Sequence, residues 1–237
     1  METTVGIVAP GKLLDEMNPR RDEYYFGNNY SNRVYELGGM PLGILPSDGY
    51  VSEEVLDRVD AFLICGGHKT WPYHLQVVHH AITTGKPLLG ICLGMQSIHC
   101  YFRLLDYAKA TGQTLSFDRK GNFWEVFQQL RKESGGLIYS VEGHKMEHIR
   151  GEEDATKQNV HLTPGSHIHR LVGQDIIRAG SFHSFAIDKP SGRLNITGKA
   201  DDGTVDVIEY GEKVLGVQFH PEIDRALMPI FSILLSK

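Results

Sequence analysis

Cysteine is scarce in this sequence: Cys65, Cys92 and Cys100 are the three among 237 residues. Three cysteines are too few, and odd in number, for a disulfide framework, so we expect a reducing compartment. No run approaches the ~18 apolar residues that a membrane span needs. The opening METTVGIVAPG has no basic segment before its short apolar run, which is not the pattern of a signal peptide. These absences predict a cytoplasmic protein that does not bind a membrane.

Positive charge is also sparse. Lys and Arg number 24 against 29 Asp and Glu, and the formal net charge is −5. No basic run or stripe occurs, which argues against nucleic acid as the main ligand. Neither a GxGxxG pattern nor a P-loop is present, and the sequence predicts no cofactor. The hydrophobic fraction of 41% is too high for a chain that is mostly disordered.

Short apolar runs alternate with amphipathic stretches in the first half of the chain. Runs that are apolar at successive positions and separated by helices predict parallel strands buried on both faces. The expected strands are Val5–Ala9, Pro41–Leu45, Ala61–Cys65 and Leu88–Ile91. This order predicts an α/β fold with an open, mostly parallel, flavodoxin-like sheet flanked by helices.

The second half of the chain has a different rhythm. Residues 106–157 are polar and contain one expected helix, Phe123–Lys132, so we interpret them as an insertion within a single domain of residues 1–237. Beyond them, turn signals between short runs predict additional antiparallel strands. These strands are His161–Thr163, Ser181–Ile187, Leu194–Ala200, Val205–Tyr210 and Val214–Phe219. Asp224 is the expected N-cap of a final helix.

The pentapeptide Gly90-Ile91-Cys92-Leu93-Gly94 carries the sharpest chemical signal. A predicted strand enters Cys92 and a helical pattern leaves it, with glycines two residues before and after. This spacing suits the strained turn of a nucleophile elbow, where bulky side chains would clash. A helix N-terminus also favours the thiolate, which is the competent nucleophile. The alternative is a buried core cysteine in a glycine-rich turn.

A second motif, Gly216-Val217-Gln218-Phe219-His220-Pro221-Glu222, supplies a base and its orienting acid. An apolar strand ends at His220, and a carboxylate follows two residues later across a stiff proline. A cysteine nucleophile needs such a pair to take and return its proton. The sequence therefore predicts a catalytic triad of Cys92, His220 and Glu222.

The two motifs, GICLGMQ and GVQFHPE in this order, resemble the class I glutamine amidotransferase-like family. Within it the sequence is similar to peptidase family C26, the γ-glutamyl hydrolases, and above all to the γ-glutamyl-γ-aminobutyrate hydrolase branch. Three further segments carry this likeness: residues 30–41 (YSNRVYELGGMP), 161–166 (HLTPGS) and 181–184 (SFHS). At the elbow the sequence has Leu93, as many amidotransferases have leucine there. The γ-glutamyl-γ-aminobutyrate hydrolase branch commonly has Arg at this position.

The resemblance implies roles for matching positions. Gly67 and Leu93 would hold the oxyanion through their backbone N–H groups. The glutamyl half of the substrate would contact four residues: Gln96, His183, Ser184 and Phe185. The implied reaction is hydrolysis of a γ-glutamyl amide, such as γ-glutamyl-γ-aminobutyrate or glutamine, through a glutamyl thioester. The resemblance also implies a homodimer.

Two other functions stay open. The chain could be a glutaminase subunit that supplies ammonia to a separate synthetase partner, or a non-enzymatic sensor or binding protein built on Cys92. A zinc site is a further hypothesis, because the segment His144–His148 matches the pattern HxxEH. Gly143 precedes this segment and it has almost no apolar face, so we expect no stable helix and no metal. We interpret it as a polar loop over the active site that offers His144 or His148 to the substrate.

Overall fold

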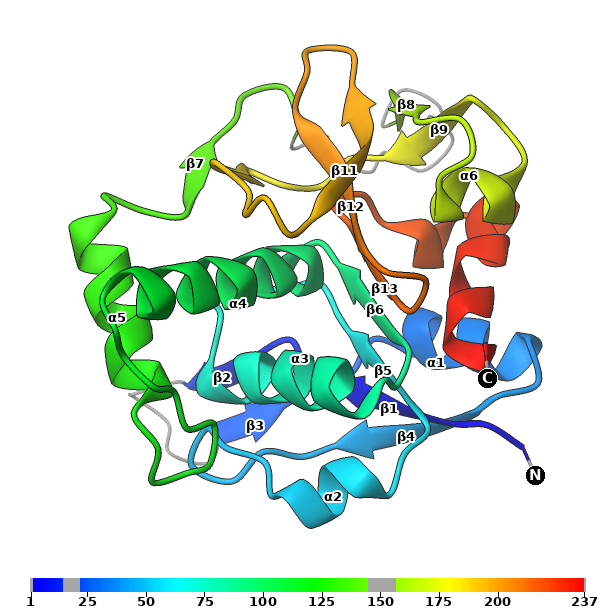
Figure 1. Ribbon diagram of the computed structural model, residues 1–237. Coiled ribbons are helices and arrows are strands. Elements are labelled where there is room, and N and C mark those ends of the chain that lie inside the picture. Colours follow the sequence, from blue (N-terminus) through cyan, green and yellow to red (C-terminus); the bar gives the residue numbers. More distant parts are fainter. Residues whose placement is uncertain (1, 15–21, 145–156, 237) are drawn as a thin grey trace.

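The computed structural model describes residues 2–14, 22–144 and 157–236. Its centre is a nine-stranded mixed sheet with the strand order β4-β1-β5-β6-β13-β12-β11-β8-β9 (Figure 1). Neighbouring strands from β4 to β13 all run parallel. These five are β4 (Met40–Ile44), β1 (Thr4–Val8), β5 (Ala61–Ile64), β6 (Leu88–Ile91) and β13 (Val214–Val217).

The other half of the sheet is antiparallel throughout. It contains β12 (Val205–Tyr210), β11 (Asn195–Ala200), β8 (Lys157–Leu162) and β9 (Ile176–Gly180). The expected α/β fold, a mostly parallel sheet with antiparallel strands added by the C-terminal half, is confirmed. Two short sheets stand apart: β10 (Phe185–Ile187) pairs with β7 (Ile138–Ser140), and β2 (Lys12–Leu14) pairs with β3 (Asp22–Tyr24).

The expected strand Ser181–Ile187 is wrong over most of its length. Only β10 is a strand, and it lies outside the main sheet. The preceding residues bond to another segment instead: the Ser181 hydroxyl and the His183 N–H both donate to the carbonyl of His144. A tertiary contact, which no local pattern reveals, therefore replaces the sheet ladder at this point.

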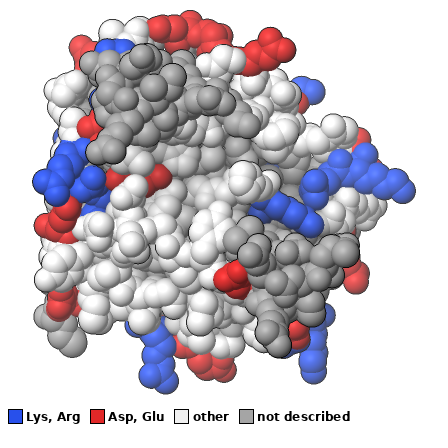
Figure 2. All heavy atoms as spheres, turned by 180° about the vertical axis from the view of Figure 1, so that it is seen from behind, with Lys and Arg blue, Asp and Glu red and all other residues white. Residues whose placement is uncertain are grey.

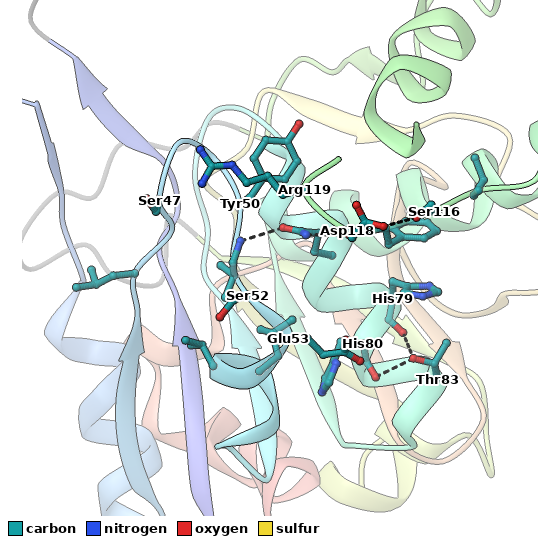
Figure 3. Close-up of a pocket in the computed structure, with 17 residues that line it drawn as sticks. Ser47, Tyr50, Ser52, Glu53, His79, His80, Thr83, Ser116, Asp118 and Arg119 are labelled. Atoms are coloured by element: carbon teal, nitrogen blue, oxygen red, sulfur yellow. Dashed lines mark hydrogen bonds between the residues drawn. The ribbon is translucent and has the colours of Figure 1, made fainter. Parts of the chain in front are cut away.

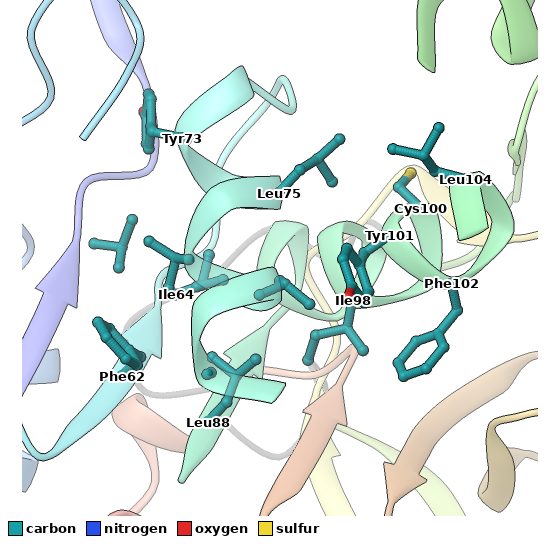
Figure 4. Packing of buried hydrophobic residues seen from close by; sticks show 14 of the residues in the cluster. Phe62, Ile64, Tyr73, Leu75, Leu88, Ile98, Cys100, Tyr101, Phe102 and Leu104 are labelled. Carbon is teal, nitrogen blue, oxygen red and sulfur yellow. The ribbon is translucent and has the colours of Figure 1, made fainter. Parts of the chain in front are cut away.

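The parallel strands β1, β5, β6 and β13 are buried, because alternate residues enter two separate cores. The expected burial on both faces is wrong for β4, an edge strand on which Met40 and Leu42 are exposed. Phe62 and Ile64 pack into one core, part of which is drawn in Figure 4, and Leu63 packs into the other. The first core contains residues of α2 (Glu53–Asp57), α3 (Pro72–Thr84), α4 (Leu93–Ala110) and α5 (Phe123–Glu133). The second contains residues of α1 (Asn28–Glu36), α6 (His167–Val172) and η3 (Arg225–Leu235).

Local sequence accounts for several element boundaries. Pro72 occupies the first turn of α3, where its missing N–H costs nothing, and Gly85 ends that helix with a φ of 69°. Asp224 caps the final segment by accepting from the Ala226 N–H, as expected. This segment, η3, is a 3₁₀-helix rather than an α-helix, and Pro229 within it lacks a backbone donor.

None of the helices formed by the described residues is long and apolar enough to cross a membrane. On the face seen in Figure 2, the Lys and Arg side chains lie mainly near the margin. Uncharged residues form much of its centre. On the right of this view several Lys and Arg side chains lie beside one another and extend to the edge, whereas the others stand apart.

Candidate active site

Cys92 lies between β6 and α4, at the carboxyl edge of the parallel strands. Its φ of 53° falls in a region that costs a non-glycine residue roughly 1–3 kcal/mol and that concentrates at functional sites. The flanking glycines permit this turn. A Cβ on Gly90 would lie 2.5 Å from the backbone of Gly94, and a Cβ on Gly94 would lie 2.3 Å from the carbonyl oxygen of Ile64. The strand–turn–helix expected around Cys92 is therefore present.

His220 reaches Cys92 because β13 lies beside β6. The Cys92 N–H donates to the carbonyl of Val217, the last residue of β13, at 2.8 Å. The chain continues to His220, whose Nδ1 lies 2.7 Å from Oε1 of Glu222. Nε2 is thus left for the Cys92 thiol, which lies beside the imidazole. A Cβ on Gly66 would lie 2.8 Å from His220 Cε1 and 3.4 Å from Cys92 Cβ. The turn after β5 therefore packs against both of these side chains.

The charges around His220 favour its protonated form. Burial of the ring opposes the imidazolium, but the Glu222 carboxylate and the hydrogen bond to Cys92 outweigh it. Together they raise the pKa of His220 to about 10. Cys92 thus lies beside this cation and at the N-terminus of the 18-residue helix α4.

Gly67 and Leu93 come together beside the cysteine. A Cβ on Gly67 would lie 2.5 Å from the carbonyl oxygen of Pro10 and 2.8 Å from Cδ2 of Leu93. Only glycine fits this approach. The N–H of the preceding Gly66 donates to the Tyr30 hydroxyl at 3.1 Å, which fixes the turn from the side of α1.

A cavity of about 670 Å³ opens over this group. It collects every residue of the predicted triad, oxyanion turn and glutamyl-binding set except Glu222, which lies behind His220. The prediction that His144 reaches the substrate is wrong, because His144 does not line the cavity. The predicted residues that line it are Cys92, His220, Gly67, Leu93, Gln96, His183, Ser184 and Phe185. Segments that are far apart in the sequence thus meet at one place, as the motifs predict.

Two of the lining side chains are already held by the protein. Gln96 Nε2 donates both to the Phe185 carbonyl and to Gln218 Oε1, each at 3.2 Å. His183 Nδ1 contacts the Phe185 carbonyl at 3.1 Å. Burial, followed by the neighbouring His144, lowers the pKa of His183 to about 4, so the ring is neutral near pH 7. Its buried Nε2 has no hydrogen-bond partner among the described residues and is an acceptor.

His144 lies behind His183, and its ring centroid is 4.7 Å from that of His183. Its Nε2 pairs with Asp202 Oδ2 at 2.9 Å, so this histidine is buried and supports the cavity wall. His148 lies outside the described residues. No group of three or more His, Cys, Asp or Glu suited to a metal ion occurs in the described part of the chain.

The profile of the class-I glutamine amidotransferases matches residues 22–228, most of the chain. The chain belongs to this family. Among sequence relatives of this amidotransferase chain, the CTP synthase of Methanothermobacter thermautotrophicus is 26% identical over 189 residues. The match covers 75% of this chain but 33% of that enzyme, so the chain spans about a third of the relative's length.

Solved structures show the same fold. A candidate GMP synthase subunit from Thermoplasma acidophilum superposes with a TM-score of 0.60 at 15% identity, over 99% of this chain and 93% of that one. A glutamine amidotransferase from Thermotoga maritima gives a TM-score of 0.58 at 16% identity, over 98% and 82% of the two chains.

Several residues of this cavity are not predicted from the sequence. The cavity is also lined by Tyr25, Lys69 and Arg131, and no Asp or Glu is among the described residues that line it. Arg131 belongs to α5, a helix that the sequence predicts without showing which core it faces. The sequence shows only that Arg131 lies in the last turn of an amphipathic helix. That position is equally typical of a solvent-exposed arginine, so it does not predict a cavity residue.

A second cavity of about 720 Å³ lies apart from these residues (Figure 3). It is formed by residues 45–52, α2, α3 and residues 115–119. One lining amide, Gln76, is used within the protein, because it accepts from the Val51 N–H and donates to the Phe117 carbonyl. Arg119 pairs with Asp48, which does not itself line the cavity. None of the predicted site residues is among the described residues that line it.

Proposed function

We propose that this chain is a cysteine-dependent hydrolase of γ-glutamyl amides. The observation that supports the proposal most is the contact of Cys92 with His220, which in turn contacts Glu222, at the floor of a cavity. This arrangement suits nucleophilic attack on an acyl carbon. Membership of the amidotransferase family supports an amide substrate.

The proposed reaction has two stages. The Cys92 thiolate attacks the γ-carbonyl carbon, and the oxyanion is held by the N–H groups of Gly67 and Leu93. The C–N bond breaks as the His220 imidazolium gives its proton to the departing amine, leaving a glutamyl thioester. Water then attacks the thioester while His220 accepts its proton. The C–S bond breaks, glutamate leaves and the thiolate returns. Glu222 stays ionised and orients the imidazole throughout.

The glutamyl half of the substrate is proposed to contact Gln96, His183, Ser184 and Phe185. The neutral His183, with Nδ1 turned to a carbonyl, offers Nε2 as an acceptor for the α-ammonium group. The amine half then extends toward Lys69 and Arg131. Two cations, with no carboxylate among the described lining residues, favour an amine that bears a carboxylate, as γ-glutamyl-γ-aminobutyrate does. We therefore propose the γ-glutamyl hydrolase branch, peptidase family C26, for this chain.

A second candidate is a glutaminase subunit that transfers ammonia to a synthetase partner. The likeness to a CTP synthase and to a candidate GMP synthase subunit favours it. The size of the cavity favours the first proposal, because glutamine releases only ammonia and leaves much of 670 Å³ unfilled. A glutaminase activity that rises sharply when a synthetase is added would reverse this order.

The test is turnover of a panel: glutamine, γ-glutamyl-γ-aminobutyrate, γ-glutamyl-anilide and a folate polyglutamate. We expect wild-type protein to release the amine from γ-glutamyl-γ-aminobutyrate fastest, and Cys92→Ala to release none. Arg131→Gln should raise KM for γ-glutamyl-γ-aminobutyrate about tenfold, the loss of roughly 1.4 kcal/mol of binding. KM for glutamine should not change. Lys132→Gln, on the same helix but outside the cavity lining, is the matched control.

Failure on every substrate would overturn the hydrolase proposal. If Cys92 is still readily alkylated in that case, the result would favour the partner-dependent glutaminase or a cysteine-based sensor. Equal KM changes in Arg131→Gln for charged and uncharged amines would remove the argument for an anionic amine half.

A further inference from the structure

Arg33 is a buried arginine beside the site, although it does not line the cavity. It lies on the inner face of α1 with Tyr30 and Val34, and its side chain is 11% exposed. Burying a guanidinium is costly unless its donors are paired. Arg33 Nε donates to the main-chain carbonyl of Glu222 at 3.0 Å, and Nη1 donates to the Glu36 carboxylate.

The bond to the Glu222 carbonyl links two segments that are 189 residues apart in the sequence. Glu222 lies in η2 (Pro221–Ile223), the short 3₁₀ turn after His220. The same residue therefore binds Arg33 through its main chain and His220 through its side chain. Hydrogen bonds weaken steeply outside a narrow range of distance and angle. A shift of this turn by about 1 Å would thus break the 2.7 Å contact with His220 Nδ1.

The contact is part of a wider junction between α1 and the C-terminal segment, which lie side by side in Figure 1. Glu36 accepts from Arg33 with one oxygen and from Arg225 Nη2 with the other, at 2.9 Å. The two arginines share this acceptor but differ in their burial. The Arg225 side chain is 78% exposed, whereas that of Arg33 is buried against Glu222. The chain thus contains a natural matched pair.

We propose that Arg33 is a positioning residue for the reaction of the Cys–His–Glu group. It holds the main chain of Glu222 so that the carboxylate stays against His220. Arg33 does not line the cavity, so its effect on the reaction passes through Glu222. The inference rests on the proposed function for its consequence in turnover, but its effect on His220 is independent of any substrate.

The experiment compares Arg33→Met, Arg33→Lys and Arg225→Met with wild-type protein. The pKa of the His220 imidazole is measured by NMR titration without substrate, and kcat and KM are measured with γ-glutamyl-γ-aminobutyrate. In Arg33→Met we expect the His220 pKa to fall by at least one unit and kcat to fall 10- to 100-fold, with KM within threefold. Arg33→Lys keeps a cationic donor and should recover part of both losses. Arg225→Met should stay within twofold of wild type in kcat.

An unchanged His220 titration in Arg33→Met would overturn the proposal, even if kcat falls, because a general loss of structure would then explain the activity. Equal effects of Arg33→Met and Arg225→Met would overturn it as well. If Arg33→Met does not fold, Arg33→Lys decides: a His220 pKa equal to that of wild type contradicts the proposal, and an intermediate value supports it. If no γ-glutamyl substrate is turned over, the proposed function fails, while the titration still decides the role of Arg33.

Discussion

Replacement of Glu222 by Gln tests how the carboxylate acts on His220. Gln keeps nearly the same shape and a carbonyl oxygen that accepts from Nδ1–H, but it removes the negative charge. The variant therefore separates charge from geometry. Because Glu222 is buried behind His220 and does not line the cavity, substrate binding should change little.

The size of the effect follows from the His220 pKa. A value of about 10 against an ordinary 6.5 is a rise of about 3.5 units, or roughly 5 kcal/mol in favour of the imidazolium. Burial opposes this rise, and Glu222 is the largest of the contributions that produce it. Loss of that charge should lower the pKa by at least about 2 units, which is roughly 2.7 kcal/mol and a hundredfold change in the ratio of imidazolium to imidazole.

The assay combines an NMR titration of the His220 imidazole with the pH profile of kcat. The imidazolium is the acid that protonates the leaving amine, so activity declines as pH rises through its pKa. In Glu222→Gln we expect this alkaline limb to move from near pH 10 to about pH 8 or lower, so that kcat at pH 9 falls about tenfold while kcat at pH 7 changes much less. KM should stay within threefold. A His220 pKa within half a unit of the wild-type value would refute the electrostatic reasoning.

Two further predictions concern stability. Gly94→Ala should lower the free energy of unfolding by about 3 kcal/mol or more in chemical denaturation, because its Cβ would strike the Ile64 carbonyl. Gly192→Ala, which meets nothing within 4 Å, should be neutral or slightly stabilising, and equal costs for the two variants would contradict this interpretation of the elbow. Burial raises the pKa of Asp206 in the folded protein to about 7, whereas in the unfolded chain it is near 4. The stabilisation that comes from protonated Asp206 is therefore fully present below pH 4 and is lost as the pH rises through 7. Wild type should therefore lose about 2.6 kcal/mol of unfolding free energy relative to Asp206→Asn between pH 5 and pH 8, and equal pH dependence of the two proteins would contradict this.

The sequence is informative where local chemistry dictates structure. Four apolar runs predict parallel strands, and β1, β4, β5 and β6 lie there with boundaries within one residue of those expected. The glycines around Cys92 predict the elbow because backbone crowding, which Gly90 and Gly94 relieve, is a local property.

Long-range contacts explain what the sequence does not predict. The strand character of β9 (Ile176–Gly180) depends on pairing with β8, because its own alternation is short. Arg33 has the appearance of a solvent-exposed helix residue until its partner, a carbonyl 189 residues away, is known. Lys69 lies in the turn that follows β5, and Arg131 lies in α5. Both line the cavity only because these two segments meet over Cys92. Their roles in specificity stay predictions.

The proposed chemistry depends on a thioester between Cys92 and the glutamyl group. Mass spectrometry of protein quenched in acid during turnover of γ-glutamyl-γ-aminobutyrate detects this intermediate. We predict a mass increase of one glutamyl acyl group on the peptide that contains Cys92, absent from Cys92→Ala and accumulating before free glutamate appears. Amine release by wild-type protein with no adduct on that peptide at any quench time, and undiminished release by Cys92→Ala, would show that the cysteine is not the nucleophile.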